Sequence, residues 1–258
     1  MPTRNTPWPA GTPCWIHYGA ADVDAARELY GRLLGWEYTG GEAEYGGYLN
    51  ATRNGEPAAG LGPLTSPGDS PGWTTYFATD DAAATCERIR EAGGTVVVEP
   101  MEVGPLGTMV VATDPQGNAF GLWQSGLHTG CRVVNEPGSL VWNEVAVDDP
   151  AAAREFYSAV FGFTYDDVDG VEGYQTFALG GHPLGGLGGS QPGAPKGWTV
   201  CFAVTSTDDV VAAVEAAGGK VTMAPMDTEF GRLAVVDDPW GAAFSVMQVP
   251  EGMPVPGS

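Results

Sequence analysis

Histidine and cysteine, the side chains that most often perform chemistry in proteins, are few in this sequence. There are 3 histidines and 4 cysteines, and no two cysteines form a C-x-x-C pair. Zinc knuckles and thioredoxin-type redox sites are therefore not indicated, and we expect free thiols. His17 is the histidine that could act as a general base, whereas His128 and His182 are expected to be solvated. The glycine-rich segment 180–189 lacks the G-K-[ST] of a phosphate loop, and we expect a mobile strand edge or lid there.

His17 has a counterpart in Glu144, because the chain contains a long internal repeat. The repeat is visible in two motifs, A-A-R-E-[LF]-Y and D-P-x-G, which begin at Ala25 and Ala152 and at Asp114 and Asp238. Self-similarity of this length indicates two homologous halves. His17 and Glu144 are therefore candidate catalytic residues, acid or base, at equivalent places. The structural alternatives are a hydrogen-bonded His17 and a Glu144 exposed at a rim.

Each half is itself a doubled unit of one strand, one helix and three strands. Asp22 can cap a helix over 22–34 whose apolar residues recur at helical spacing, and Gly35 can end it. A second helix is predicted over 81–92, and the D-P-x-G segment has the residues of a tight turn before a last strand. The order βαβββ thus occurs four times in an α+β fold. One unit has too little sheet to enclose a core, so units must pair, within a half or across halves.

These modules and motifs together resemble the vicinal oxygen chelate superfamily, which includes glyoxalase I, extradiol dioxygenases and bleomycin-resistance proteins. More narrowly, the sequence is similar to actinobacterial two-domain glyoxalase-like proteins, among them a mycobacterial antigen and accessory proteins of anthracycline-type pathways. The resemblance implies cupped mixed sheets with helices on the convex side. The predicted boundaries are domain 12–127 with modules 12–66 and 70–127, linker 128–138, domain 139–250 with modules 139–191 and 196–250, and tails 1–11 and 251–258.

The resemblance also says where a metal would be bound. Metal-binding members carry ligands near the start of a module's first strand and a glutamate in the strand after D-P-x-G. The matching residues here are Trp15, Thr74 and Gly121 in the first half and Trp142, Thr199 and Ser245 in the second. None is an imidazole or a carboxylate, of which a divalent site needs several. We therefore expect no metal and no cofactor, unless His17 and Glu144, two residues along the same strand face, are recruited.

Alternation along the expected strands places an aromatic, lightly polar set of side chains on the cup face. The set is Trp15, His17, Thr74, Tyr76 and Trp123 in the first half, and Trp142, Glu144, Thr199, Cys201, Ser245 and Met247 in the second. Large rings stack on flat ligands, and Glu144 could pair with a cationic or hydroxylated group. The set therefore predicts a small-molecule site. The alternative is that the two first-strand tryptophans are core residues and Cys201 a small buried filler.

Three functions follow from these residues. The favoured one is metal-independent binding of an aromatic natural product of polyketide type, either with or without an attached aminosugar. Such binding would serve sequestration and resistance, or the protein would be an accessory to a biosynthetic oxygenase. The second is a metal-dependent lyase or oxidoreductase of glyoxalase or dioxygenase type. The third is a metal-free enzyme that uses His17 or Glu144 as acid or base on a polyketide.

The charge balance excludes polyanionic partners. Against 32 Asp+Glu there are only 11 Lys+Arg, which gives a formal net charge of −21. Nucleic acids and anionic membranes require a positive surface. No apolar run approaches the roughly 20 residues of a membrane span, and the N-terminal residues lack the apolar region of a secretory signal. We expect a cytoplasmic monomer or homodimer whose partner is a small molecule, neutral or cationic.

Overall fold

The computed structural model of the chain describes residues 3–64 and 68–249. The predicted tail 251–258 and the first two residues of the predicted tail 1–11 lie outside these ranges. The first half contains β1 (Pro13–Ala20), α1 (Val23–Leu34), β2 (Glu37–Gly40), β3 (Leu49–Arg53), β4 (Glu56–Pro63), β5 (Gly72–Ala78), α2 (Ala82–Glu91), β6 (Thr95–Glu102), β7 (Gly107–Thr113) and β8 (Ala119–Ser125). The second half contains β9 (Leu140–Val147), α3 (Pro150–Phe161), β10 (Thr164–Asp167), β11 (Tyr174–Leu179), β12 (His182–Gly189), β13 (Gly197–Ala203), α4 (Thr207–Ala216), β14 (Lys220–Thr228), β15 (Gly231–Asp237) and β16 (Ala243–Gln248). The predicted α+β order, βαβββ four times, is confirmed.

The helices begin and end where local chemistry predicts. The Asp22 carboxylate accepts a hydrogen bond from the Ala25 amide at 3.0 Å, and Asp81 accepts one from Ala84 at 2.9 Å. Each cap satisfies an amide that has no partner within the first turn of its helix. Gly35 ends α1 with φ of 67°, a left-handed conformation that costs glycine little.

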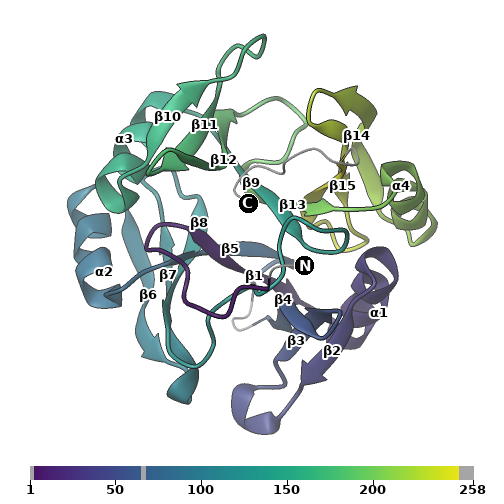
Figure 1. Cartoon of the computed structure of the whole chain (residues 1–258), viewed down its shortest axis with the longest axis horizontal. Coiled ribbons are helices and arrows are strands. Elements are labelled where there is room, and N and C mark those ends of the chain that lie inside the picture. Colours follow the sequence, from purple (N-terminus) through teal and green to yellow (C-terminus); the bar gives the residue numbers. More distant parts are fainter. Residues whose placement is uncertain (1–2, 65–67, 250–258) are drawn as a thin grey trace.

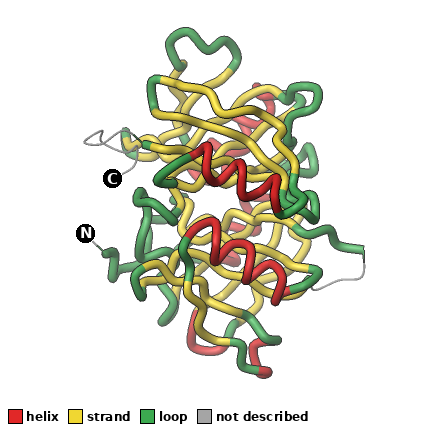
Figure 2. The backbone as a smooth tube through the Cα atoms, turned by 90° about the vertical axis from the view of Figure 1, so that its right-hand side faces the viewer, coloured by secondary structure: helices red, strands yellow, loops and turns green. Residues whose placement is uncertain are grey.

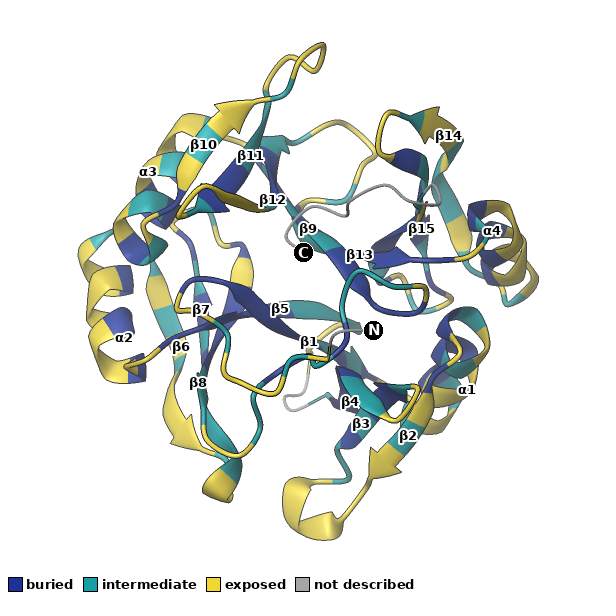
Figure 3. Cartoon of the chain, viewed as in Figure 1, coloured by how far each residue is buried: buried dark blue, intermediate teal, exposed yellow. Residues whose placement is uncertain are grey.

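Each half forms one mixed sheet of eight strands, so the modules pair within a half. The strand orders are β2-β3-β4-β1-β5-β8-β7-β6 and β10-β11-β12-β9-β13-β16-β15-β14. In both sheets the two first strands of the modules lie side by side and antiparallel at the centre, β1 with β5 and β9 with β13. The short outer strands β2 and β10 are mostly exposed, whereas the central strands are mostly buried (Figure 3). The question of pairing that the sequence left open is thereby answered.

The two sheets pack back to back through the faces that carry the helices. Helix α1 lies beside α4, and α2 lies beside α3 (Figures 1 and 2). Aromatic rings meet across the halves, with centroids 5.6 Å apart for Trp36 and Phe202 and 5.0 Å apart for Phe77 and Trp198. The two large hydrophobic cores each combine residues of both halves. The opposite face of each sheet, called here its outer face, therefore points away from the other half.

The repeated motifs supply the polar part of this interface. The Tyr30 hydroxyl donates to the Asp238 carboxylate at 2.9 Å, and the Tyr157 hydroxyl donates to Asp114 at 3.0 Å. The helix tyrosine of one half thus reaches the D-P-x-G aspartate of the other half, in both directions. Tyr18 adds a further hydrogen bond to Asp238 at 2.5 Å. Because buried carboxylates and hydroxyls are costly without partners, these bonds favour one relative placement of the halves.

The glycine-rich segment 180–189 is not a strand edge or lid, and that prediction is wrong. Its residues 182–189 are strand β12, which is hydrogen-bonded to β11 on one side and to β9 on the other. The glycines are needed because aromatic rings lie against the strand: a Cβ at Gly185 would overlap the Phe177 ring, and one at Gly186 would overlap Tyr174. None of the helices in the described ranges is long and apolar enough to cross a membrane.

Candidate ligand-binding site

The sequence-predicted residues of the first half lie together on the outer face of the first sheet. Across β1 and β5, Trp15 is opposite Tyr76 and His17 is opposite Thr74. Trp123 follows on β8, opposite Ala78 of β5. The pleat therefore directs these side chains to one side, as the alternation of residues predicts.

The predicted residues of the second half lie on the outer face of the second sheet. Trp142 is opposite Cys201, and Glu144 is opposite Thr199. On β16, Ser245 is opposite Cys201, and Met247 is opposite Ala203. Since the sheets pack back to back, the two predicted sets line two separate faces and do not combine into one site.

Tyr48 is a residue of the first outer face that the sequence analysis missed. It precedes β3 and folds over the sheet, where its hydroxyl accepts a hydrogen bond from the Trp15 indole at 3.0 Å. Its ring stacks on His17 at a centroid distance of 5.3 Å, and its hydroxyl lies 3.3 Å from the His17 Nδ1. Gly60 makes room for it, because a Cβ there would overlap the Tyr48 hydroxyl.

Tyr174, which the sequence analysis also missed, is the counterpart of Tyr48 on the second outer face. Its hydroxyl accepts from the Trp142 indole at 3.1 Å, and it lies on Gly186. A signal was present in the sequence, because each tyrosine follows a glycine and each half also contains a Gly-Leu-Gly on which the tyrosine rests. The Gly-Tyr pairs are residues 47–48 and 173–174, and the Gly-Leu-Gly segments are 60–62 and 186–188.

His128 covers the first outer face, so the prediction that it is solvated is wrong. Its ring meets Trp15 edge to face at 4.4 Å and Trp123 at 5.5 Å. Its Nδ1 accepts from the Gly130 amide, and its carbonyl accepts from the Trp123 indole at 2.8 Å. Contact between the imidazole and the two indoles removes apolar ring surface from water, which favours this placement of His128. Trp15 is consequently only 5% exposed. His182 is exposed, as expected.

The N-terminal residues 4–11, predicted as a tail, adjoin this cover. The Trp8 indole donates to the Cys131 carbonyl at 3.0 Å, and the Gly11 amide donates to the Ala78 carbonyl at 2.8 Å. Trp8 packs against the cluster of buried residues that contains Trp15 and Trp123. The linker and the N-terminal segment thus both lie over the first half.

His17 is neutral near pH 7. Burial lowers the pKa of its imidazole to about 4, because the charged form loses hydration and gains no anionic partner. Across the strands it faces Thr74 and Gly60, which carry no charge. It can therefore accept a proton or a hydrogen bond, and a protonated His17 is disfavoured in the folded protein.

Glu144 is the acidic counterpart on the second outer face. Burial raises the pKa of its carboxyl group, and a hydrogen bond with Tyr174 partly opposes this shift. Within residues 3–64 and 68–249 no ion pair of Glu144 is formed with Lys, Arg or His. Burial and the nearby Glu144 charge raise the pKa of the Cys201 thiol, so Cys201 is not an activated nucleophile.

Comparison with known proteins gives the family. Two segments, 15–122 and 139–246, match the model of the Glyoxalase/Bleomycin resistance protein/Dioxygenase superfamily. The chain belongs to this superfamily. Among its relatives is CFP32 of Mycobacterium tuberculosis, which carries a glyoxylase name and is 39% identical over 257 residues, covering 96% of this chain and 98% of the relative. The anthracycline biosynthesis protein DnrV of Streptomyces peucetius is 38% identical over 264 residues, covering 95% of each chain.

Solved structures of the superfamily share the fold. The Mn(II)-bound glyoxalase from Novosphingobium aromaticivorans has a TM-score of 0.67 at 17% identity and covers 93% of this chain and 82% of its own. The 2,3-dioxygenase LapB from Pseudomonas sp. KL28 has a TM-score of 0.64 at 16% identity, and the match covers 98% of this chain and 97% of LapB. At these identities the likeness establishes the architecture and not the activity.

The residues of this member do not match a divalent metal site. The positions that would carry ligands hold Trp15, Thr74, Gly121, Trp142, Thr199 and Ser245. The place beside Gly121 is filled by the Tyr76 ring, which a Cβ there would overlap. In the part of the chain that the structure describes, no three His, Cys, Asp or Glu side chains gather where one ion could be held. His17 and Glu144 lie on different sheets, so they cannot serve one ion together.

Proposed function

We propose that this protein binds a planar aromatic small molecule of polyketide type on the outer face of the second sheet, without a metal ion. The observation that carries the proposal is the Trp142 indole, which is only partly buried, beside the Glu144 carboxylate, which has no cationic partner among the described residues. An indole offers stacking area to a flat ring system, and an acid without a partner favours a ligand that brings a positive charge. The anthracycline names of DnrV and DauV support the ligand class.

The second outer face is preferred over the first for a steric reason. On the first face, the His128 ring already packs against Trp15, with ring centroids 4.4 Å apart. Trp142 is the counterpart of Trp15 and is more exposed than the 5% of Trp15. On β16 the place equivalent to Trp123 is held by Met247, a flexible side chain that adapts to irregular ligands. One polyketide ligand per chain is therefore expected.

Glu144 gives the site its preference for an aminosugar. A protonated amine near the carboxylate would stabilise its charged form, so ligand binding would lower the pKa that burial has raised. Affinity for an aminoglycosylated ligand should consequently rise with pH as Glu144 ionises. Binding of this kind serves sequestration and resistance, or delivery of the polyketide to a biosynthetic oxygenase.

Calorimetric titration with an aminoglycosylated anthracycline and with its sugar-free ring system tests the proposal. Glu144→Gln should weaken the glycosylated ligand about tenfold, the worth of one charge-assisted contact, and leave the ring system unchanged. Trp142→Leu should weaken both. His17→Gln and Trp15→Leu are the matched controls on the first face and should change neither. Binding that is equally sensitive to the controls, or no binding of either ligand, would refute the assignment.

A metal-free acid–base reaction is the second candidate, favoured by the raised pKa of Glu144. A buried carboxyl group with a raised pKa suits proton transfer near neutral pH. Conversion of a polyketide substrate that is lost in Glu144→Gln, while calorimetry still detects binding of the ring system, would support it. Elemental analysis of the purified protein separates both candidates from a metal enzyme: we expect no stoichiometric Mn, Fe, Ni or Zn.

A further inference from the structure

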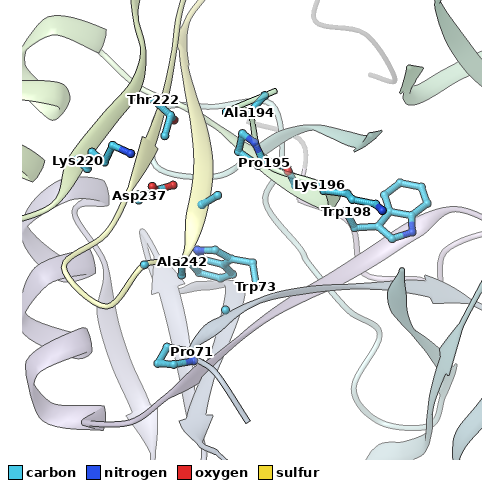
Figure 4. Close-up of a pocket in the computed structure, with 15 residues that line it drawn as sticks. Pro71, Trp73, Ala194, Pro195, Lys196, Trp198, Lys220, Thr222, Asp237 and Ala242 are labelled. Atoms are coloured by element: carbon cyan, nitrogen blue, oxygen red, sulfur yellow. The ribbon is translucent and has the colours of Figure 1, made fainter. Parts of the chain in front are cut away.

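A pocket of about 390 Å³ lies between the two halves, away from the tryptophans of both outer faces. The first half contributes residues 71–73, and the second contributes residues 193–196, 198, 199, 220, 222, 237 and 241–243. In Figure 4 the Lys220 and Asp237 side chains come from the neighbouring strands β14 and β15, with the Trp73 indole in the wall below them. The volume is in the range of small-molecule sites and would hold one or two fused rings.

Both lysines of the chain line this pocket. Lys196 and Lys220 are the only lysines among 258 residues, in a protein of formal net charge −21, and both line the pocket. Lys196 is paired with Asp148 at 2.5 Å. Lys220 forms no ion pair with any residue in the described ranges, although Asp237 is its cross-strand neighbour in β15. Of the two ammonium groups that line the pocket, that of Lys220 is therefore the one without an ion pair among the described residues.

Two tryptophans supply its apolar part. The indole nitrogens of Trp73 and Trp198 donate to Tyr30 and Tyr157 at 3.1 and 2.9 Å. Their polar edges are therefore satisfied inside the interface, and both rings are only partly buried. Ring surface held rigidly in this way contacts a flat ligand at little cost in conformational entropy.

We propose that this pocket binds a small aromatic carboxylate, with its ring against Trp73 and its carboxylate paired with Lys220. A single uncommitted ammonium matches a single negative charge, and elsewhere the acidic surface repels anions. The pocket shares Thr199 with the predicted set of the second outer face, but Lys220 and Trp73, on which this proposal rests, are not part of that set. Because both halves contribute walls, the bound anion would also stabilise their association.

Calorimetry with 2-naphthoate at low ionic strength tests this site, with neutral 2-naphthamide as the ligand control. Lys220→Gln should weaken naphthoate about tenfold, and Asp237→Asn should strengthen it, because the competing carboxylate is removed. Arg27→Gln removes one positive charge from the exposed face of α1, outside this pocket, and should leave affinity unchanged. Glu144→Gln should also leave it unchanged, which separates this result from the polyketide site.

Equal affinity for naphthoate and naphthamide would overturn the proposal, as would Lys220→Gln binding like the unmodified protein. A thermal melt provides a second readout. Saturating naphthoate should raise the melting temperature of the unmodified protein by mass action. The rise should be several-fold smaller in Lys220→Gln at the same ligand concentration. A rise of the same size in both proteins would likewise refute the assignment.

Discussion

The hydrogen bonds between the halves predict an order of stability among three Tyr→Phe variants. Tyr18 and Tyr30 both donate to Asp238, at 2.5 and 2.9 Å. Tyr30 also accepts a hydrogen bond from the Trp73 indole at 3.1 Å, whereas no indole among the described residues donates to Tyr18. Removing the Tyr30 hydroxyl therefore breaks one bond to a carboxylate and leaves an indole N–H without its acceptor.

The magnitudes follow from these two losses. A hydrogen bond to a charged group contributes about 1.5–3 kcal/mol, and an unsatisfied buried donor costs about 1–3 kcal/mol. Tyr18→Phe should lower the free energy of unfolding by about 2 kcal/mol, since Asp238 keeps Tyr30. Tyr30→Phe should cost about 3–4 kcal/mol because the Trp73 donor is only partly buried. Tyr157→Phe should match Tyr30→Phe, because Tyr157 has the same pair of bonds, to Asp114 and Trp198.

Urea unfolding followed by tryptophan fluorescence and by circular dichroism measures these differences. Coincidence of the two transitions shows whether the halves unfold together and whether one free energy is defined. A Tyr18→Phe variant as destabilised as Tyr30→Phe would refute the reasoning, because it would mean that the indole bond contributes nothing. Phenylalanine keeps the ring in place, so the comparison measures the hydroxyl and not a cavity.

Three further outcomes are expected. The folded pKa of His17, about 4, lies below its ordinary value of 6.5, so its contribution to stability is complete above pH 6.5 and is lost as pH falls toward 4. The loss is at most about 3 kcal/mol, and urea midpoints of His17→Gln at pH 7 and pH 5 should differ less than those of the unmodified protein. Gly186→Ala should displace Tyr174 and lower stability by about 1–3 kcal/mol. Gly189→Ala in the same strand, where a Cβ would make only an ordinary contact with the Pro150 Cγ at 3.8 Å, should be neutral or slightly stabilising in the same assay. The four cysteines are buried, so a thiol reagent should modify none of them rapidly until urea unfolds the protein.

The sequence was sufficient for the features that depend on local chemistry. Asp22 and Gly35 bound α1 because cap and turn preferences act over a few residues. The alternation of Trp142 and Glu144 predicted a shared face because the pleat has a period of two. The pairing of modules within a half could not be predicted in this way, because it depends on contacts between strands far apart in the chain. Either pairing satisfies the same alternation.

Two of the three missed residues lie in segments between regular elements, and the third, Tyr174, is the first residue of β11. Tyr48 and His128 reach the first outer face from a loop and from the linker, where no periodicity assigns a side chain to a face. Tyr30 and Asp238 served as family motifs in the sequence, yet their hydrogen bond joins positions 208 residues apart. Physical pairing over such a separation becomes visible only in the folded chain.

The duplication also explains how the two halves can differ in function while the fold stays symmetric. The reciprocal pairs, Tyr30 with Asp238 and Tyr157 with Asp114, tie each half to the other, so a change in any of these groups affects both. The outer faces carry no such reciprocal constraint, because they point away from each other. On these faces the equivalent positions differ: the first carries the neutral His17 and the second carries the acidic Glu144. A protein built in this way can keep one face covered by its own linker and present the other to a polyketide, which is why a single polyketide site per chain is the expected stoichiometry.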